Sequence, residues 1–223
     1  MKRLSKTDRK KASVKVLIHT LEQLYPEALC ALDYTEDYRL MIAGRLSAQC
    51  TDKRVNTVTP LLFERYPTLK SLADADIHDV EEIIKPCGLY HTKAQSIVEM
   101  CRVLYYDMDG VIPDTLEELT KLPGIGRKTA NLIMGDVHHK PAIVCDTHCI
   151  RITNRLGLTS SKDPQKCEKE LWETVPPEES SALCHRIVLF GRDICTARKP
   201  DCGHCPLRLA LEAEEAALKC SEC

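Results

Sequence analysis

Residues 122–135 read LPGIGRKTANLIMG, and this stretch decides how the chain is interpreted. A proline and two glycines precede the lysine at position 128, and an apolar, helix-like run follows it directly. The N-terminus of a helix carries partial positive charge and unpaired N–H groups, so a cation in the first turn is unfavourable. A lysine at this position therefore points to chemistry or to a binding partner rather than to helix stability.

The pattern predicts a hairpin of two helices, a brief one over 116–121 and a second that starts at 127. Gly124 and Gly126 allow positive φ angles and a close approach of the backbone to a partner. The N–H groups at the start of the second helix would then point at one spot and bind an anion such as a DNA phosphate. The alternative is an ordinary helix–turn–helix corner that needs glycine only for its turn.

Lys128 and Asp146 together favour a catalytic interpretation. A partly desolvated lysine is a poor resting cation, but a neutral amine is a nucleophile that forms Schiff bases with carbonyl-level carbon. Asp146 lies in the stretch VCDTH, just before an apolar periodic segment, where a carboxylate can cap a helix. Such a carboxylate can also face a cleft and stabilise positive charge developing on a sugar. The alternative for Lys128 is a solvated phosphate clamp.

The composition excludes several other classes of protein. The 223 residues carry a net charge of −2, so the chain is not a generally basic nucleic-acid binder. Aromatic residues make up only 4%, too few for a base-stacking platform. No apolar stretch approaches about 18 residues and no signal peptide is visible, so we expect no membrane segment. We expect a cytoplasmic protein, nucleoid-associated if bacterial, whose 13 cysteines are reduced.

Apolar residues recur mostly at spacings of three and four along the chain, which predicts helices throughout. Only residues 142–145 resemble a strand, and four residues make no sheet. The sequence therefore predicts an all-α protein. The predicted helices towards the C-terminus lie at about 127–137, 147–156, 164–174 and 182–190.

Several motifs, in order, resemble the helix-hairpin-helix DNA glycosylases, and within them the endonuclease III family. They are LSAQCTD (46–52), CGLYHTKA (87–94), LPGIGRKTAN (122–131), VCDTH (144–148) and FGRDICTARKPDCGHC (190–205). The resemblance covers roughly residues 10–205, which makes it far more specific than one short motif.

The resemblance implies a bifunctional glycosylase and abasic-site lyase acting in base excision repair. Lys128 would attack the sugar C1′ and displace a damaged base, most simply an oxidised pyrimidine, and β-elimination would cut the strand 3′ to the abasic site. Asp146 would assist base loss or help to deprotonate the lysine. The implied partner is double-stranded DNA that contains damaged bases or abasic sites, bound by a monomer. The alternatives are a monofunctional mismatch glycosylase, or a non-catalytic binder of distorted DNA.

The family comparison also assigns contacts with a duplex from which the target base has been flipped. Gln49 would fill the gap, Leu89 would wedge the base step apart, and His148 would be a third contact near the lesion. The alternatives to these DNA contacts are that Leu89 is a core residue and that His148 is buried or caps a helix.

The same comparison implies two helical lobes. A central lobe over about 30–140 would carry the hairpin, and residues 1–29 with 141–223 would form a discontinuous second lobe with the cysteine cluster. The active-site cleft would lie between the lobes, with Lys128 and Asp146 on opposite walls.

Three cysteines near the C-terminus have the spacing of iron–sulfur ligands, Cys195-x6-Cys202-x2-Cys205. The family pattern continues with x5-Cys, but this chain has Leu211 at that position. Retention of three cysteines in the motif favours a [4Fe–4S] cluster with a structural role, since a lysine-based lyase needs no electron and no Lewis acid.

The fourth ligand is left open by the sequence. Cys220 or Cys223 could fold back to the cluster. Alternatively, Cys202 and Cys205 could form a zinc-type quartet with Cys220 and Cys223, or the site could be degenerate and hold no metal.

Overall fold

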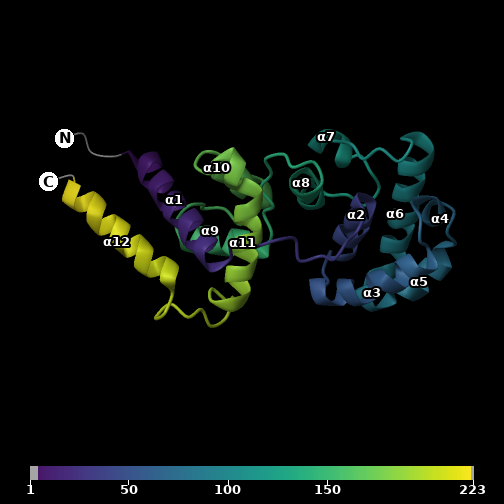
Figure 1. Ribbon diagram of the computed structural model, residues 1–223, viewed down its shortest axis with the longest axis horizontal. Coiled ribbons are helices and arrows are strands. Elements are labelled where there is room, and N and C mark those ends of the chain that lie inside the picture. The colour runs from purple at the N-terminus through teal and green to yellow at the C-terminus, as the bar shows by residue number, and fades with distance from the viewer. Residues whose placement is uncertain (1–4, 222–223) are drawn as a thin grey trace. The chain divides into compact units, whose positions relative to one another are not determined.

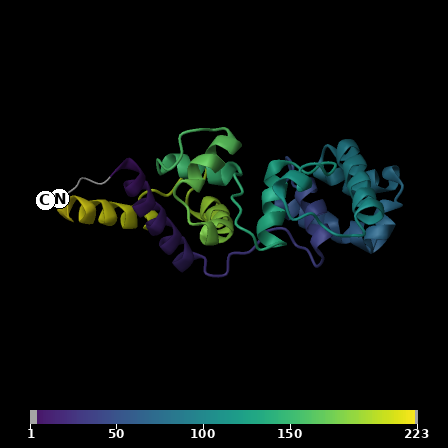
Figure 2. The same cartoon turned by 90° about the horizontal axis from the view of Figure 1, so that it is seen from above.

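The computed structural model describes the backbone of residues 5–221 and the side chains of residues 5–217. The chain divides into two compact units, which we call the central unit (residues 30–140) and the terminal unit (residues 1–29 and 141–223). Within the described residues every regular element is a helix, as Figures 1 and 2 show, so the predicted all-α class is confirmed. Residues 142–145 form no strand.

The central unit is built around α6 (Tyr90–Arg102), which packs against α4 (Leu69–Ala73) and α5 (Ile77–Ile84). On another side, α2 (Asp37–Leu46) contacts α3 (Asp52–Arg65), α6 and α8 (Arg127–Asp136). Short helical segments complete the unit: η1 (Lys85–Cys87), η2 (Val103–Asp107) and α7 (Leu116–Leu119). The apolar positions at helical spacing form one continuous core, in which Leu40, Ile97 and Ile133 are fully buried.

The terminal unit joins the two ends of the chain. Helix α1 (Lys6–Leu24) packs along α12 (Pro206–Ser221) and against α11 (Ser180–Asp193), as the purple and yellow helices of Figure 1 show. Helix α11 also packs against α9 (Thr147–Arg155), and α10 (Pro164–Trp172) and η3 (Pro177–Glu179) close the unit. Its separate core includes Leu17, Leu21 and Phe190.

Most helices begin where the sequence supplies a short polar side chain. Hydroxyl or carboxylate oxygens accept a backbone N–H of the first turn, as N-caps do. These capping residues are Ser5, Thr51, Thr68, Asp76, Thr115, Asp146 and Asp163. Among the described helices, none combines the length and the apolar character needed to cross a membrane.

The turn between α7 and α8 depends on Gly124. Its φ angle is +77°, a left-handed conformation that L-residues disfavour. A Cβ atom there would lie 2.7 Å from Nε of Arg45 and 2.8 Å from Oγ of Ser96. Arg45 donates a hydrogen bond to Ser96 across 2.8 Å, so the turn rests directly on a bond between α2 and α6.

Gly126, by contrast, does not have the positive φ angle that the sequence suggested. It has φ −90° and ψ 170°, an extended conformation that any residue adopts, and it is the N-cap of α8. A Cβ atom there would meet nothing within 4 Å. The turn therefore uses positive φ at Gly124 and not at Gly126, whose open position leaves room for a partner to approach the backbone.

We expect the two glycines to respond differently to the same substitution. Gly124→Ala should lower the free energy of unfolding by about 1–3 kcal/mol, because alanine there is strained and crowded. Gly126→Ala should change it by less than about 1 kcal/mol, because the position is open and extended. Urea denaturation of the two variants beside the unsubstituted protein measures this difference, and equal destabilisation would contradict it.

Candidate functional site

Lys128 lies on the first turn of α8, directly after the glycine turn. Its side chain is exposed, and within the central unit its ammonium group has no hydrogen-bonding or ionic partner. The partial desolvation expected from the sequence is therefore not provided by this unit, because the side chain leaves the helix on its open face. No side chain caps the N-terminus of α8 at Gly126, so the first turn keeps its capacity to bind an anion.

Two predicted DNA contacts lie on strained backbone in the same unit. Gln49 has a φ angle of +53° and Leu89 of +51°, although neither is glycine. Leu89 follows Gly88, which also has positive φ, and it is 55% exposed, so it is not a core leucine. Large residues adopt this conformation only where the surrounding structure enforces it, and such positions concentrate at functional sites.

A buried lysine that the sequence analysis missed connects these two strained loops. Lys93 is 0% exposed, and its Nζ donates to the carbonyl oxygens of Leu46 at 2.8 Å and Cys87 at 2.9 Å. Burial lowers the pKa of its ammonium group, an effect opposed by the nearby thiols of Cys50 and Cys87. One sequence signal was available: position 93 lies four residues before the buried Ile97, on the apolar face of α6.

Asp146 is the N-cap of α9 in the terminal unit. Its Oδ1 accepts the backbone N–H of Cys149 at 2.7 Å, and the side chain is half-buried. The capping function expected from the sequence is therefore present. The cap orients the carboxylate at the helix end, where the partial positive charge of the helix attracts an anionic group.

His148 lies in the first turn of the same helix and packs against Gly191 of α11. The guanidinium group of Arg151 lies 3.2 Å from its Nδ1 and also donates to the carbonyl oxygens of Gly191 and Cys195. Guanidinium is only a donor, so a hydrogen bond across this contact requires an Nδ1 that carries no proton. The ring is half-buried and its orientation is set by Arg151.

Arginine side chains from α9 also organise the cysteine loop. Arg155 donates to Sγ of Cys195 at 3.2 Å, to the carbonyl oxygen of Thr196 at 2.9 Å and to that of Ala197 at 3.0 Å. Cys195 and Cys205 are half-buried beside the core of the terminal unit, whereas Cys202 is exposed. Arg155 belongs to none of the motifs of the sequence, although it occupies the same face of α9 as Arg151.

The position of the family's fourth cysteine is filled by an apolar contact. Leu211 packs against the core of the terminal unit from α12. The side chain of Cys220 and the whole of Cys223 lie outside the described residues. At a rise of about 1.5 Å per residue, the backbone of position 220 lies about 20 Å along α12 from its start at Pro206. Because Cys205 directly precedes that start, the straight helix carries position 220 away from the cysteine loop.

The described side chains contain no group of three His, Cys, Asp or Glu residues already arranged to hold a metal ion. The donor set nevertheless fits an iron–sulfur cluster in part. Three thiols lie in one loop, at spacings short enough to converge, and a cationic side chain contacts one of the sulfurs. The loop offers three thiolates, whereas a [4Fe–4S] cluster is held by four.

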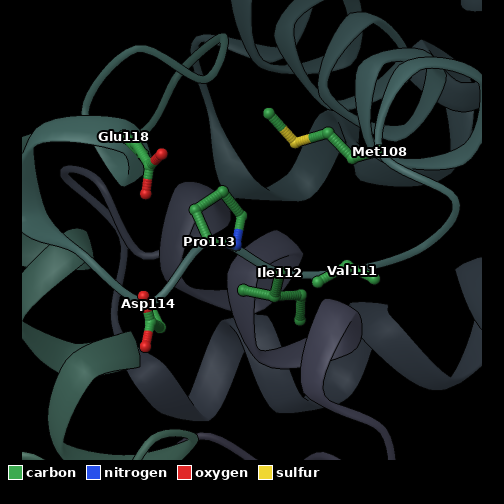
Figure 3. A pocket seen from close by; sticks show the side chains of 6 residues that line it. All are labelled: Met108, Val111, Ile112, Pro113, Asp114 and Glu118. Carbon is green, nitrogen blue, oxygen red and sulfur yellow. The ribbon is translucent and has the colours of Figure 1, made fainter.

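The two pockets described in the central unit are not lined by the candidate site residues. Figure 3 shows a pocket of about 460 Å³ that is lined by apolar side chains and two carboxylates. Its lining residues are Met108, Val111, Ile112, Pro113, Asp114 and Glu118. A second pocket, of about 420 Å³, lies beside Tyr34 and Phe63. Neither is lined by a residue that the sequence analysis selected, so we assign no chemistry to them.

Comparison with known proteins identifies two matching family models. Residues 42–177 match the HhH-GPD superfamily of base excision DNA repair proteins. Residues 195–208 match the iron–sulfur binding domain of endonuclease III. This second match ends before Leu211 and contains all three candidate cysteine ligands. An iron–sulfur cluster is therefore the cofactor to be expected of this loop.

Relatives and solved structures agree with these models. Endonuclease III from Synechocystis sp. is 42% identical over 205 residues, which cover 92% of this chain and 94% of the relative. A trapped covalent intermediate of endonuclease III with DNA superposes with a TM-score of 0.84 at 37% identity, covering 93% of this chain and 98% of the other. A non-covalent endonuclease III–DNA complex gives a TM-score of 0.85 at 37% identity, covering 94% and 98%. The predicted resemblance is thus confirmed, and the chain belongs to the endonuclease III family of HhH-GPD base excision DNA repair proteins.

Proposed function

We propose that this protein is a base-excision DNA glycosylase with abasic-site lyase activity, and that Lys128 is its nucleophile. The observation that carries the proposal is the position of this lysine. Its side chain is exposed and has no partner within its unit, and it lies in the first turn of an uncapped helix that directly follows a glycine turn. An amine that serves a structural ion pair would be paired. The relative trapped in covalent linkage with DNA supports the same chemistry.

In the proposed reaction the Lys128 amine attacks C1′ of the flipped nucleotide. The bond between C1′ and the base breaks, and the base leaves with the electron pair. The C1′–O4′ bond then breaks with its electron pair passing to O4′, which takes up the proton that the nitrogen loses, and the opened sugar remains bound to the lysine as a Schiff base. Loss of a C2′ proton expels the 3′ phosphate, which cuts the strand by β-elimination. The exposed N-terminus of α8 and the open space at Gly126 would let a DNA phosphate approach the backbone.

Asp146 would act on the same nucleotide from the terminal unit. A carboxylate stabilises the positive charge that develops on the sugar as the base departs, and it can accept the proton that the attacking lysine loses. Its cap on α9 holds one oxygen in place and so limits the rotation of the group. His148, whose orientation is set by Arg151, would contact DNA near the lesion.

Gln49 and Leu89 would stabilise the duplex around the extruded nucleotide. Leu89 is large, apolar and exposed, which suits a wedge between base steps. Gln49 is exposed on a separate loop and offers both a donor and an acceptor to an unpaired base. The substrate would be double-stranded DNA with oxidised pyrimidines or abasic sites. We expect a monomer in the cytoplasm, associated with the nucleoid if the cell is bacterial.

Three cysteines would hold the family's iron–sulfur cluster, namely Cys195, Cys202 and Cys205. We assign the cluster a structural role in shaping the loop, which also carries Arg198 and Lys199 and could present positive charge to phosphates. Because Leu211 packs against the core and has no thiol, the cluster would lack a cysteine ligand at the family's fourth position.

Lys128→Gln should abolish the covalent adduct that borohydride traps with abasic duplex DNA, because an amide cannot form a Schiff base. Lys121→Gln is the matched control: this lysine belongs to the same hairpin but is paired with Glu117 at 2.8 Å, and trapping should persist. Unsubstituted protein that releases a damaged base from a panel of lesion duplexes without cutting the strand would indicate a monofunctional glycosylase instead.

Asp146→Asn should slow base release by about 10²–10³-fold while leaving stability nearly unchanged. Asparagine caps helices about as well as aspartate but carries no charge, so the substitution separates chemistry from capping. Asp146→Ala should in addition lower the free energy of unfolding by about 0.5–2 kcal/mol. Single-turnover kinetics and urea denaturation measure the two effects, and an unimpaired Asp146→Asn variant would remove the carboxylate from the mechanism.

Purified protein should contain iron and sulfide and absorb at about 400 nm, as iron–sulfur proteins do. Leu211→Cys should slow the release of iron to a chelator, because it supplies a fourth thiolate at the family spacing. Leu209→Cys, on the same helix but 59% exposed and at the wrong spacing, is the control. Colourless protein with one zinc per chain, or equal iron release from all three proteins, would contradict the assignment.

A further inference from the structure

A lone cation is fully buried at the point where three segments of the central unit meet. Lys93 belongs to the first turns of α6, and its ammonium group bonds the last residue of α2, Leu46, and the last residue of η1, Cys87. Both hydrogen-bond acceptors are backbone carbonyl oxygens, and neither is a carboxylate. Burying a charge without an opposite charge costs stability, so hydrophobic packing does not explain why this position is lysine.

The loops that begin just after the two bonded carbonyl groups explain the lysine better. Three residues after Leu46 comes Gln49, with φ +53°, and two residues after Cys87 comes Leu89, with φ +51°. Both loops therefore leave a helix end that Lys93 holds, and both turn at once into a left-handed conformation. A neutral side chain at 93 would leave two carbonyl oxygens without their donor, next to the backbone that must hold this strain.

Other contacts link the same loops less directly. Burial and the nearby thiol of Cys50, the residue after Gln49, raise the pKa of the Cys87 thiol, so the two loops lie close together at these cysteines. Oγ1 of Thr92 donates to the carbonyl oxygen of Leu89 at 3.0 Å. Lys93 differs from these contacts because its single Nζ atom donates to the ends of both α2 and η1.

We propose that Lys93 is a positioning residue that holds the Gln49 and Leu89 loops at a fixed separation, so that both side chains enter a damaged duplex together. The inference rests on the proposed DNA contacts of these two residues. It deepens that proposal by naming the group that couples them. Lys93 touches neither DNA nor the reacting atoms.

Lys93→Met in the full chain tests the inference, because methionine has similar length and no donor. Cleavage at an abasic site in duplex DNA should slow by about 10- to 100-fold, the scale expected for misplaced contacts. Cleavage of the same site in a single-stranded oligonucleotide should change by less than about 2-fold, because no stack has to be held open there. A lysine with only a structural role would affect both substrates alike. Lys70→Met, an exposed lysine of α4 paired with Asp74, is the control.

Amide hydrogen exchange supplies a second readout. In Lys93→Met, peptides that contain residues 47–51 and 87–91 should exchange faster, whereas peptides from α8 should keep their protection. Unchanged exchange in both loops, or equal slowing on duplex and single-stranded DNA, would overturn the inference. If Lys93→Met and Lys93→Gln both fail to fold, the lysine is a requirement of folding and the inference is likewise overturned.

Variants of the two loop residues separate this inference from the proposed function. Gln49→Ala and Leu89→Ala should each slow duplex cleavage. The double variant Lys93→Met/Leu89→Ala should slow cleavage by a smaller factor than the product of the two single-variant factors. If neither alanine variant is impaired, the DNA contacts of the proposed function are wrong. If both are impaired and Lys93→Met is not, the contacts stand and the positioning role is refuted.

Discussion

The contact between α2 and α6 is the constraint on which the central unit depends. Three hydrogen bonds cross it: Arg45 donates to Oγ of Ser96 at 2.8 Å, Lys93 donates to the carbonyl oxygen of Leu46 at 2.8 Å, and Arg45 also donates to the carbonyl oxygen of Thr92 at 3.4 Å. The first lies beneath Gly124 and fixes the turn from which α8 starts, and so it places Lys128. The second lies beneath the loop that carries Gln49. One helix pair thereby sets the proposed nucleophile and the proposed duplex contacts on a common rigid base, as a preorganised site requires.

Four non-glycine residues of this unit have positive φ, and two of them, Gln49 and Leu89, are proposed DNA contacts, whereas Asp109 and His139 have no proposed function. Gln49 and Leu89 adopt left-handed conformations that glycine would adopt at less cost, so a side chain at each position must have a use that offsets the strain. Gly124 shows the opposite solution, because there only the absence of a side chain lets the turn rest on Arg45 and Ser96. Gln49 and Leu89 thus provide side chains that can project, whereas Gly124 lacks a side chain at a point where the backbone packs closely.

In the terminal unit, side chains from a helix order a loop that has little secondary structure. Arg151 and Arg155 extend from α9 and donate to backbone carbonyl oxygens and to one sulfur of the cysteine loop. Guanidinium groups suit this task because each offers several donors in a fixed plane. The same α9 begins at Asp146 and carries His148, so loop order and the proposed chemistry share one helix. Leu211 occupies the position where the family pattern continues with a fourth cysteine, so the chain departs from that pattern at this point.

The sequence by itself determined the helical class, the hairpin and the family, because helical periodicity, glycine turns and ordered motifs are local properties of the chain. It also singled out Lys128, Asp146 and the three cysteines by their chemistry. Tertiary structure alone decided that Gly124 and not Gly126 carries the strained turn, that Lys128 is exposed in its unit, and that Lys93 is buried between two loops. Those outcomes depend on which segments, distant in sequence, pack together, and neither residue spacing nor propensity records which carbonyl oxygen a lysine will reach.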